Sequence, residues 1–223
     1  MKTYLPELTV SDLMNAVTSH DWSCVEEKLG TQQYERLGLD RALAIASDLI
    51  ARHQSLQGLK VLDVGCNNGL VAKTLSALGI GVVGIDNSDV DRQGLYSDLQ
   101  SQTRFAEFEY HRKDLTEFLD EEDRCWDCIL LLSVTHHWES AYAMSGERRR
   151  YSDDDIRRLL ATLFRRTRLS IYYECPSYEP GFKAGFGVEF LFRHCGELPK
   201  LRVLGKTIGP NGYLRQLWAL DME

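Results

Sequence analysis

The chain has 223 residues, enough for one well-buried α/β domain and too few for two domains of ordinary size. Its formal charge of −7 argues against non-specific attraction to nucleic acid or anionic membranes, and the sequence contains no run of about 18 apolar residues for insertion into a bilayer. Six cysteines form no compact disulfide framework and the N-terminus lacks a charged-then-apolar secretion signal, so we expect a cytoplasmic protein with reduced thiols.

Residues 1–57 are expected to form a helical cap, because apolar residues recur at helical spacing, most clearly from Asp40 to Ile50. From residue 58 to residue 223, short apolar stretches alternate with helical patterns, and we expect one compact core domain there. The expected strands are 60–64, 81–86, 104–111, 126–134 and 168–174, and the expected helices are 69–78, 89–100, 114–121, 153–164 and 187–195. Such alternation is typical of a parallel sheet with helices on both faces.

The last third of the chain contains the clearest local signals. Ser152 and Asp155 form a capping box, which predicts a helix start at this point. The segment 175–186 is rich in proline, glycine and aromatic residues and is a candidate lid. The stretches 201–208 and 213–220 flank a Gly-Pro-Asn-Gly turn, so we expect an antiparallel hairpin at the end of the chain.

An apolar strand breaks into a glycine-bearing turn in the stretch Val61-Leu62-Asp63-Val64-Gly65-Cys66-Asn67-Asn68-Gly69. Gly65 lets the backbone turn beside a ligand, and Gly69 opens a helix whose free N–H groups face the same crevice. The spacing is not the G-x-G-x-x-G of dinucleotide-binding proteins. Asp86, which ends the next apolar strand, is placed to accept both hydroxyl groups of a ribose. A nucleoside with an amino acid tail therefore fits this turn better than a dinucleotide.

These residues resemble the first motif of class I S-adenosylmethionine-dependent methyltransferases, which reads roughly acid-x-Gly-x-Gly-x-Gly. Asn67 replaces the middle glycine, and asparagine tolerates left-handed backbone angles. The resemblance covers about residue 58 to the C-terminus and implies an α/β fold with a Rossmann-like, seven-stranded, mostly parallel sheet whose last strand is antiparallel. It also implies S-adenosyl-L-methionine as cofactor and S-adenosyl-L-homocysteine as product.

The same resemblance places the family's adenine-contacting pair at Asp114 and Leu115. The Asp114 carboxylate would accept from the adenine amino group, and the Leu115 N–H would meet a ring nitrogen; alternatively, Asp114 only caps the following helix. The expected cofactor-binding residues are Asp63, Gly65, Cys66, Asn67, Gly69, Asp86, Asn87, Asp114, Leu115 and Ser133.

The segment Leu131-Leu132-Ser133-Val134-Thr135-His136-His137-Trp138 resembles the family's stretch beside the transferring methyl group, where the acceptor should lie. Histidine titrates in the range suited to a general base, so we take His137 as the base and His136 as its support. The alternative is that one histidine packs against the sheet and the other caps a turn. Glu174 is a third catalytic candidate through a hydrogen bond to the acceptor, with a solvated strand-end glutamate as the alternative.

Four further residues are candidates for binding the acceptor: Trp138, Arg148, Arg149 and Arg150. The three arginines follow the His-His segment and could hold an anionic acceptor through forked hydrogen bonds, although a solvated helix face is the simpler interpretation of the arginine-rich stretch 148–168.

The cysteines give no comparable signal. Cys125-x-x-Cys128 lacks a second C-x-x-C partner, so we expect no metal site. Cys175-Pro176 reverses the dipeptide order of cytosine-C5 methyltransferases, so we expect a structural cysteine there rather than a nucleophile.

Within the family, the Ser-Val-Thr-His-His segment and the closing hairpin look most like domains that methylate a sugar or phosphate at the end of a glycan. The Gly-Cys-Asn turn and Ser-Val-Thr also resemble the Bicoid-interacting type of RNA-end phosphate methyltransferase. We therefore expect O-methylation of a hydroxyl or phosphate group on a saccharide or small molecule, phosphorylated acceptors included. The alternatives are RNA-end phosphate methylation and a non-catalytic, cofactor-binding regulatory protein. The sequence leaves the oligomeric state open.

Overall fold

A computed structural model describes residues 10–19, 23, 33–67, 69–87, 108–140, 151–176, 187–208 and 214–222. The predicted helix 89–100, the arginines Arg148, Arg149 and Arg150, and nearly all of the candidate lid lie outside these residues. None of the helices in the described ranges is both long enough and apolar enough to cross a bilayer.

Seven strands form a single sheet in the order β3-β2-β1-β4-β5-β7-β6. The strands are β1 Lys60–Val64, β2 Gly81–Asp86, β3 Glu109–Arg112, β4 Trp126–Leu132, β5 Thr167–Pro176, β6 Lys200–Ile208 and β7 Leu214–Asp221. Strands β1 to β5 pair in parallel, whereas β7 is antiparallel to both β5 and β6. The predicted mostly parallel sheet, with its last strand inserted antiparallel, is confirmed.

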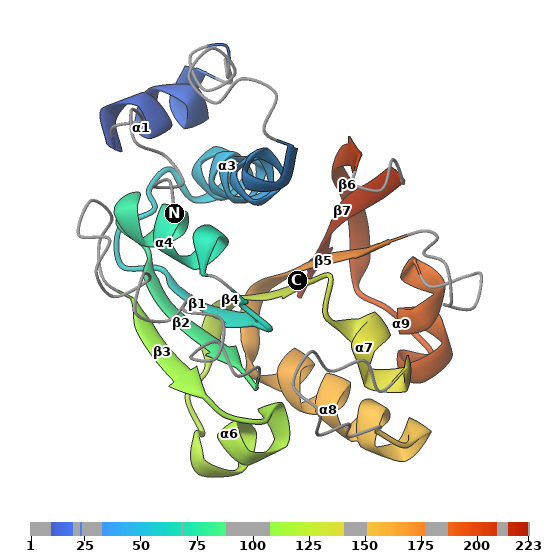
Figure 1. Ribbon diagram of the computed structural model, residues 1–223. Coiled ribbons are helices and arrows are strands. Elements are labelled where there is room, and N and C mark those ends of the chain that lie inside the picture. The colour runs from blue at the N-terminus through green and yellow to red at the C-terminus, as the bar shows by residue number, and fades with distance from the viewer. Residues whose placement is uncertain are drawn as a thin grey trace.

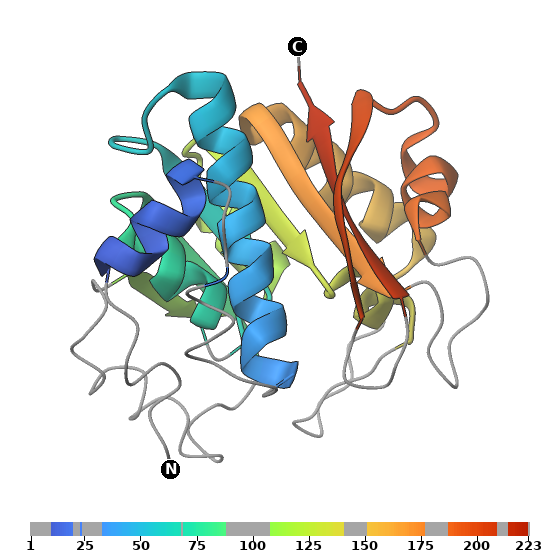
Figure 2. The same cartoon turned by 90° about the horizontal axis from the view of Figure 1, so that it is seen from above.

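Helices cover both faces of this sheet (Figures 1 and 2). One face carries α1 Val10–Ser19, α3 Gln33–His53 and α4 Leu70–Ala77, and the other carries α6 Leu115–Glu121, α8 Asp153–Arg166 and α9 Val188–Cys195. A short helix, α7 Thr135–Ser140, follows directly on β4. The long α3 helix lies along the sheet beside α4, so the N-terminal segment contributes to the same core as the strands.

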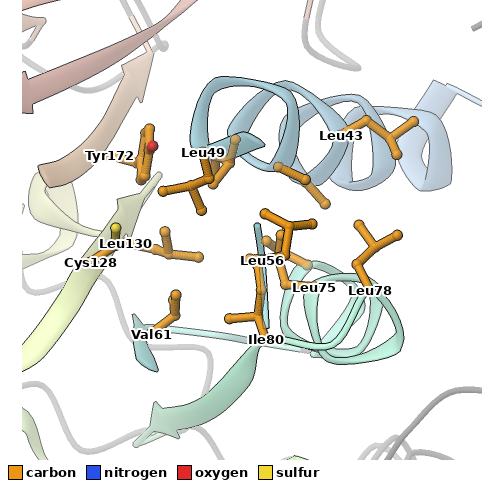
Figure 3. Close-up of a cluster of buried hydrophobic side chains, with 14 of the residues drawn as sticks. Leu43, Leu49, Leu56, Val61, Leu75, Leu78, Ile80, Cys128, Leu130 and Tyr172 are labelled. Atoms are coloured by element: carbon orange, nitrogen blue, oxygen red, sulfur yellow. The ribbon is translucent and has the colours of Figure 1, made fainter. Parts of the chain in front are cut away.

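Each face of the sheet has its own hydrophobic cluster, because side chains of a strand alternate between faces. In β4, Cys128 and Leu130 point toward α3 and α4, whereas Ile129 and Leu131 point toward α6, α8 and α9. Figure 3 shows the first cluster, where Tyr172 of β5 joins leucines from both helices. The central strands are buried on both faces, which leaves their carboxyl ends as the place where polar groups meet a ligand.

Several element boundaries explain how the site is built. Helix α8 begins with the predicted capping box, in which the Ser152 hydroxyl accepts from the Asp155 N–H and the Asp155 carboxylate accepts from the Ser152 N–H. Strand β4 was predicted to reach residue 134 but ends at Leu132, because Ser133 takes a left-handed backbone angle with φ 56°. That turn leads into α7, a helix that the sequence analysis did not predict.

Candidate functional site

The turn between β1 and α4 has the backbone conformation that its glycines suggested. Gly65, Asn67 and Gly69 have φ values of 70°, 48° and 69°, so all three lie in the left-handed region. The Gly65 N–H donates to the Ile85 carbonyl at 2.8 Å, which ties the turn to β2. A Cβ at Gly65 would lie 2.7 Å from the Val134 side chain, so glycine is required both by backbone angle and by space.

Asp63 is a buried carboxyl group on β1, only 3% exposed, and its Oδ2 atom has no hydrogen-bond partner among the described residues. Burial raises its pKa to about 7, against the opposing effect of the Arg41 guanidinium; the carboxylate of Asp86 adds to the rise. A buried carboxylate oxygen without a donor is costly. Asp63 therefore has unused capacity to accept a hydrogen bond from a cationic or N–H-bearing ligand.

Asp86 ends β2 beside the same turn. Its Oδ2 accepts a hydrogen bond from the Asn67 N–H at 2.8 Å, and its side chain is partly exposed. Asn87, the next residue, is exposed. Because β1 and β2 pair in parallel, with Val64 opposite Ile85, the carboxylates of Asp63 and Asp86 reach the same edge of the sheet.

Asp114 follows the end of β3 at the same edge and caps α6. Its Oδ1 accepts from the Thr116 N–H at 2.9 Å, and both of its oxygens lie within 2.9 Å of the Tyr151 hydroxyl. Leu115 begins the helix as a buried residue. An adenine amino group at this carboxylate would share it with these donors.

The residues of the glycine turn fit an adenosyl cofactor on structural grounds. The left-handed turn leaves no room for a Cβ at Gly65, Asp63 holds an orphaned buried oxygen, and Gly69 caps α4 without a side-chain hydrogen bond. Carboxyl groups from three consecutive strand ends face the same edge. Cys66 is buried in the turn, with its sulfur close to Gly84 of β2, and so packs rather than faces solvent.

Beside this turn, a buried charge cluster surrounds Glu174. The Glu174 side chain is fully buried and accepts hydrogen bonds from Arg41 at 2.5 Å, from Arg215 at 3.2 Å and from the Ser133 hydroxyl at 3.2 Å. Arg41 comes from α3 and Arg215 from β7, so the cluster joins the two ends of the chain at the carboxyl edge of β4 and β5. This burial favours an anchoring role for Glu174 over direct contact with an acceptor.

His136 and His137 lie at the start of α7, with ring centroids 3.9 Å apart. His136 is buried, and desolvation lowers its pKa to about 3, with the neighbouring His137 and Arg215 adding to the effect. Desolvation also lowers the pKa of His137, but the carboxylate of Asp86 opposes the shift. Both imidazoles are therefore neutral at pH 7, and His137 is the less buried of the two.

Two other candidate residues are part of the packed core. Trp138 is buried against Tyr151 and Phe190, with ring centroids 6.2 and 6.4 Å away, which favours packing over acceptor binding. Cys175 is buried and its pKa is raised by that burial to about 12, so its thiol stays protonated, as expected of a structural cysteine.

One cluster in the described part of the chain has the composition of a metal site. Glu139, Asp153 and His194 bring ligand atoms within 4.8 Å of one another. The Glu139 carboxylate, however, already accepts from Arg193 at 2.9 Å and lies 3.1 Å from His194 Nε2. A guanidinium cation thus already compensates this carboxylate, and we assign no metal to the cluster.

Three residues that no sequence motif indicated lie at this site: Arg41, Tyr151 and Arg215. Each comes from an element remote in sequence from the motifs it contacts. None of the three carries a local sequence pattern. The packing of α3 places Arg41, the pairing of β7 with β5 places Arg215, and the hydrophobic cluster around α8 places Tyr151.

Comparison with known proteins shows similarity to methyltransferases. Residues 61–167 match a family model described as a methyltransferase domain. The chain is 26% identical over 104 residues to the ubiquinone biosynthesis O-methyltransferase of Maricaulis maris, covering 46% of this chain and 39% of that protein. It is 35% identical over 86 residues to the mitochondrial ubiquinone biosynthesis O-methyltransferase of Mus musculus, covering 37% and 22%. The matched segments thus span less than half the length of these curated relatives.

Solved structures share the fold at lower identity. Magnesium protoporphyrin IX methyltransferase from Synechocystis PCC 6803, solved with bound S-adenosylhomocysteine, superposes with a TM-score of 0.54 at 16% identity and covers 95% of this chain and 98% of that one. The bifunctional kinase-methyltransferase WbdD superposes with a TM-score of 0.59 at 20% identity, covering 94% of this chain and 46% of that one.

Proposed function

Because the chain carries a class I S-adenosylmethionine-dependent methyltransferase domain, we propose that it transfers a methyl group to an oxygen atom of a small-molecule or saccharide acceptor. The observation that carries this proposal is the edge of the sheet where Asp63, Asp86 and Asp114 follow three adjacent strands beside a left-handed glycine turn. S-adenosylmethionine supplies a methyl group on a positively charged sulfur, which leaves as a neutral thioether.

Each carboxylate would bind a different part of the donor. Asp86 would accept from the ribose hydroxyls, since a carboxylate has acceptor capacity for both. Asp63 would accept from the ammonium end of the amino acid tail, which would satisfy its buried Oδ2 atom. Arg41, whose charge acts on Asp63 and whose guanidinium binds Glu174, would pair with the tail carboxylate.

His137 is the proposed general base for a hydroxyl acceptor. Its pKa is held below the usual value of 6.5, so the neutral imidazole that can take a proton predominates at pH 7. The His136 ring lies beside it, with an angle of 44° between the ring planes, and also stays neutral. The rest of the rate enhancement comes from alignment of the acceptor oxygen with the methyl group. Such positioning can lower an activation barrier by ~7–11 kcal/mol. A phosphate oxygen is already ionised at pH 7 and needs no base.

Two lines support oxygen as the accepting atom. The curated relatives are named O-methyltransferases, and the segment after β4 lacks the Asn-Pro-Pro-Tyr type of sequence that holds a planar amino group in many nitrogen methyltransferases. The preference for a saccharide or phosphorylated acceptor rests on the resemblance of the Ser-Val-Thr-His-His segment to glycan-end enzymes, and on the arginines Arg148, Arg149 and Arg150 that follow it.

The test is an acceptor search with a methyl-labelled donor. The protein is incubated with fractionated metabolites, sugars and RNA ends, and the fraction that gains label is identified and its methylated atom assigned by mass spectrometry and NMR. Label on a hydroxyl or phosphate oxygen of a small molecule or saccharide supports the proposal. Label on RNA ends alone would favour the RNA-end phosphate alternative.

A non-catalytic, cofactor-binding regulatory role makes a different prediction. Such a protein would bind the donor tightly and label no fraction, with or without the substitution His137→Ala. The proposed enzyme instead labels an acceptor in a reaction that this substitution slows.

A further inference from the structure

We propose that Tyr151 is a positioning residue for adenine recognition, which it serves by fixing the carboxylate of Asp114. This inference rests on the proposed function and on the role that the resemblance gives to Asp114, whose carboxylate would accept from the adenine amino group of the donor. The Tyr151 hydroxyl lies 2.9 Å from Asp114 Oδ1 and 2.8 Å from Asp114 Oδ2, so a single donor engages both oxygens.

The Tyr151 hydroxyl is held rigidly. Its ring is 8% exposed and packs edge-on against Trp138, and its N–H donates to the Trp138 carbonyl at 3.1 Å. The next residue, Ser152, is the cap of α8. Moving the hydroxyl away from Asp114 would require the ring to leave the hydrophobic cluster between the sheet and α8. The free energy of its buried contacts would then be lost.

A rigid donor that spans both oxygens sets the plane of the Asp114 carboxylate. Thr116 adds a second constraint, since its N–H donates to Oδ1 at 2.9 Å and its hydroxyl donates to the same atom at 2.5 Å. With the carboxylate plane fixed by these donors, an adenine amino group would approach Asp114 from one defined direction, and a carbonyl oxygen at the same point would be repelled by the carboxylate.

Tyr151 also connects the adenine end of the site to its acceptor end. The same Trp138 that packs on Tyr151 follows His137 in α7. Through this contact, the Asp114 carboxylate and the proposed base His137 are attached to the same group of packed aromatic side chains. We therefore expect Tyr151 to stay in place when the cofactor binds.

The test compares two ligands on three proteins by calorimetry. The ligands are S-adenosylhomocysteine and S-inosylhomocysteine, in which an oxygen replaces the adenine amino group. The proteins are wild type, Tyr151→Phe and the control Tyr172→Phe, which loses an equally buried tyrosine hydroxyl bonded to Asp48 at 2.8 Å on the opposite face of the sheet. Thermal unfolding run in parallel ensures that folded fractions are compared, and phenylalanine keeps the packed ring.

We expect wild type and Tyr172→Phe to prefer the adenosyl ligand by the same factor. Tyr151→Phe should bind the adenosyl ligand about five- to tenfold more weakly while its affinity for the inosyl ligand changes less than about twofold, since one hydrogen bond to a charged group is lost. If wild type does not distinguish the ligands, the assignment of Asp114 to adenine fails. If wild type distinguishes them and Tyr151→Phe does so equally well, or binds the adenosyl ligand more tightly, the inference about Tyr151 is wrong.

Discussion

At the scale of single residues, the site depends on ionisable groups held in unusual protonation states by burial. Asp63 is buried near one cation, Arg41, and one anion, Asp86, and desolvation outweighs the cation. The histidines lie a short distance away and are shifted in the opposite direction, because burial disfavours their charged forms. Burial thus disfavours the charged forms of Asp63, His136 and His137 in the ligand-free site, and a positively charged donor would favour ionised Asp63.

Asp63 should make the ligand-free protein less stable as pH rises. Its folded pKa of about 7 lies above the ordinary 3.8, so the folded state holds the proton more tightly than the unfolded state. That stabilisation is fully present below pH 3.8 and is lost as pH rises through about 7. Urea unfolding from pH 5 to pH 8 should show this fall for wild type and a smaller one for Asp63→Asn. Identical slopes for the two proteins would show that Asp63 is not the titrating group.

His137 should control turnover and not donor binding. We expect His137→Gln to lower kcat by about 10²- to 10⁴-fold with an unchanged dissociation constant for the donor, as for loss of a general base. Because burial holds the pKa of His137 below 6.5, the acidic limb of kcat for a hydroxyl acceptor should lie below that pH. The control is His53→Gln, at the end of α3 before β1, and so at the other edge of the sheet. Equal kcat values for the two variants would remove His137 from the mechanism.

At the scale of elements, the β1–α4 turn is the feature on which donor binding most depends. Its left-handed residues bring the start of α4 against β2, and Val134, just after β4, closes over Gly65. The turn is therefore packed between β2 and the segment after β4. A side chain added in the turn would have to displace one of these two segments.

Gly65→Ala should abolish donor binding, whereas Gly196→Ala should not. Both glycines have positive φ values, 70° and 74°, but a Cβ at Gly196 meets nothing within 4 Å. Both variants should lose about 1–3 kcal/mol of stability from backbone strain. Only Gly65→Ala should lose more, through the clash with Val134, and lose binding in calorimetry. Normal donor affinity in Gly65→Ala would show that the turn is not the cofactor site.

Elements with a strong local signal could be predicted from the sequence, and elements set by a single backbone angle could not. The capping box at Ser152 and the glycine turn at Gly65 are local patterns, and both have the predicted structure. Strand β4 was predicted two residues too long because Ser133, with φ 56°, looks like any serine in sequence. Helix α7 was missed for the same reason, since it begins only where that angle turns the chain.

At the scale of the whole molecule, charged side chains join the N-terminal helix α3 to the C-terminal strands. Asp48 of α3 accepts hydrogen bonds from Arg202 of β6 at 2.7 and 3.0 Å and from the Tyr172 hydroxyl at 2.8 Å. Arg52, one turn later, binds Asp221 of β7 at 2.8 Å. A second connection, through Arg41, Glu174 and Arg215, lies at the site itself.

These connections show why the positions of the candidate cofactor residues could be predicted and the charge cluster could not. Asp63 and Asp86 lie within or just after strands that the sequence marks by themselves. Arg41 and Arg215 reach Glu174 only once α3 packs on the sheet and β7 pairs beside β5. Glu174 therefore looked like a solvated strand end or an acceptor contact in sequence, and its full burial between two arginines is a tertiary property.

Asp48→Ala should destabilise the whole fold. The substitution leaves Arg202 and the Tyr172 hydroxyl without this acceptor, and we expect a loss of about 2–4 kcal/mol in the free energy of unfolding, as for breaking a largely buried ion pair. The control, Asp154→Ala, removes an exposed carboxylate paired with Arg157 at 2.8 Å and should cost less than about 1 kcal/mol. Equal losses from the two substitutions would mean that the α3 connection contributes no more than a surface ion pair.

The central claim is that carboxyl groups at three adjacent strand ends hold an adenosyl cofactor, and calorimetry with S-adenosylhomocysteine tests it most directly. We predict binding with one ligand per chain, no binding of NAD under the same conditions, and about ten- to hundredfold weaker binding by Asp86→Ala, which removes the acceptor for the ribose hydroxyls. Protein that is folded by circular dichroism and yet takes up neither S-adenosylmethionine nor S-adenosylhomocysteine would contradict the account.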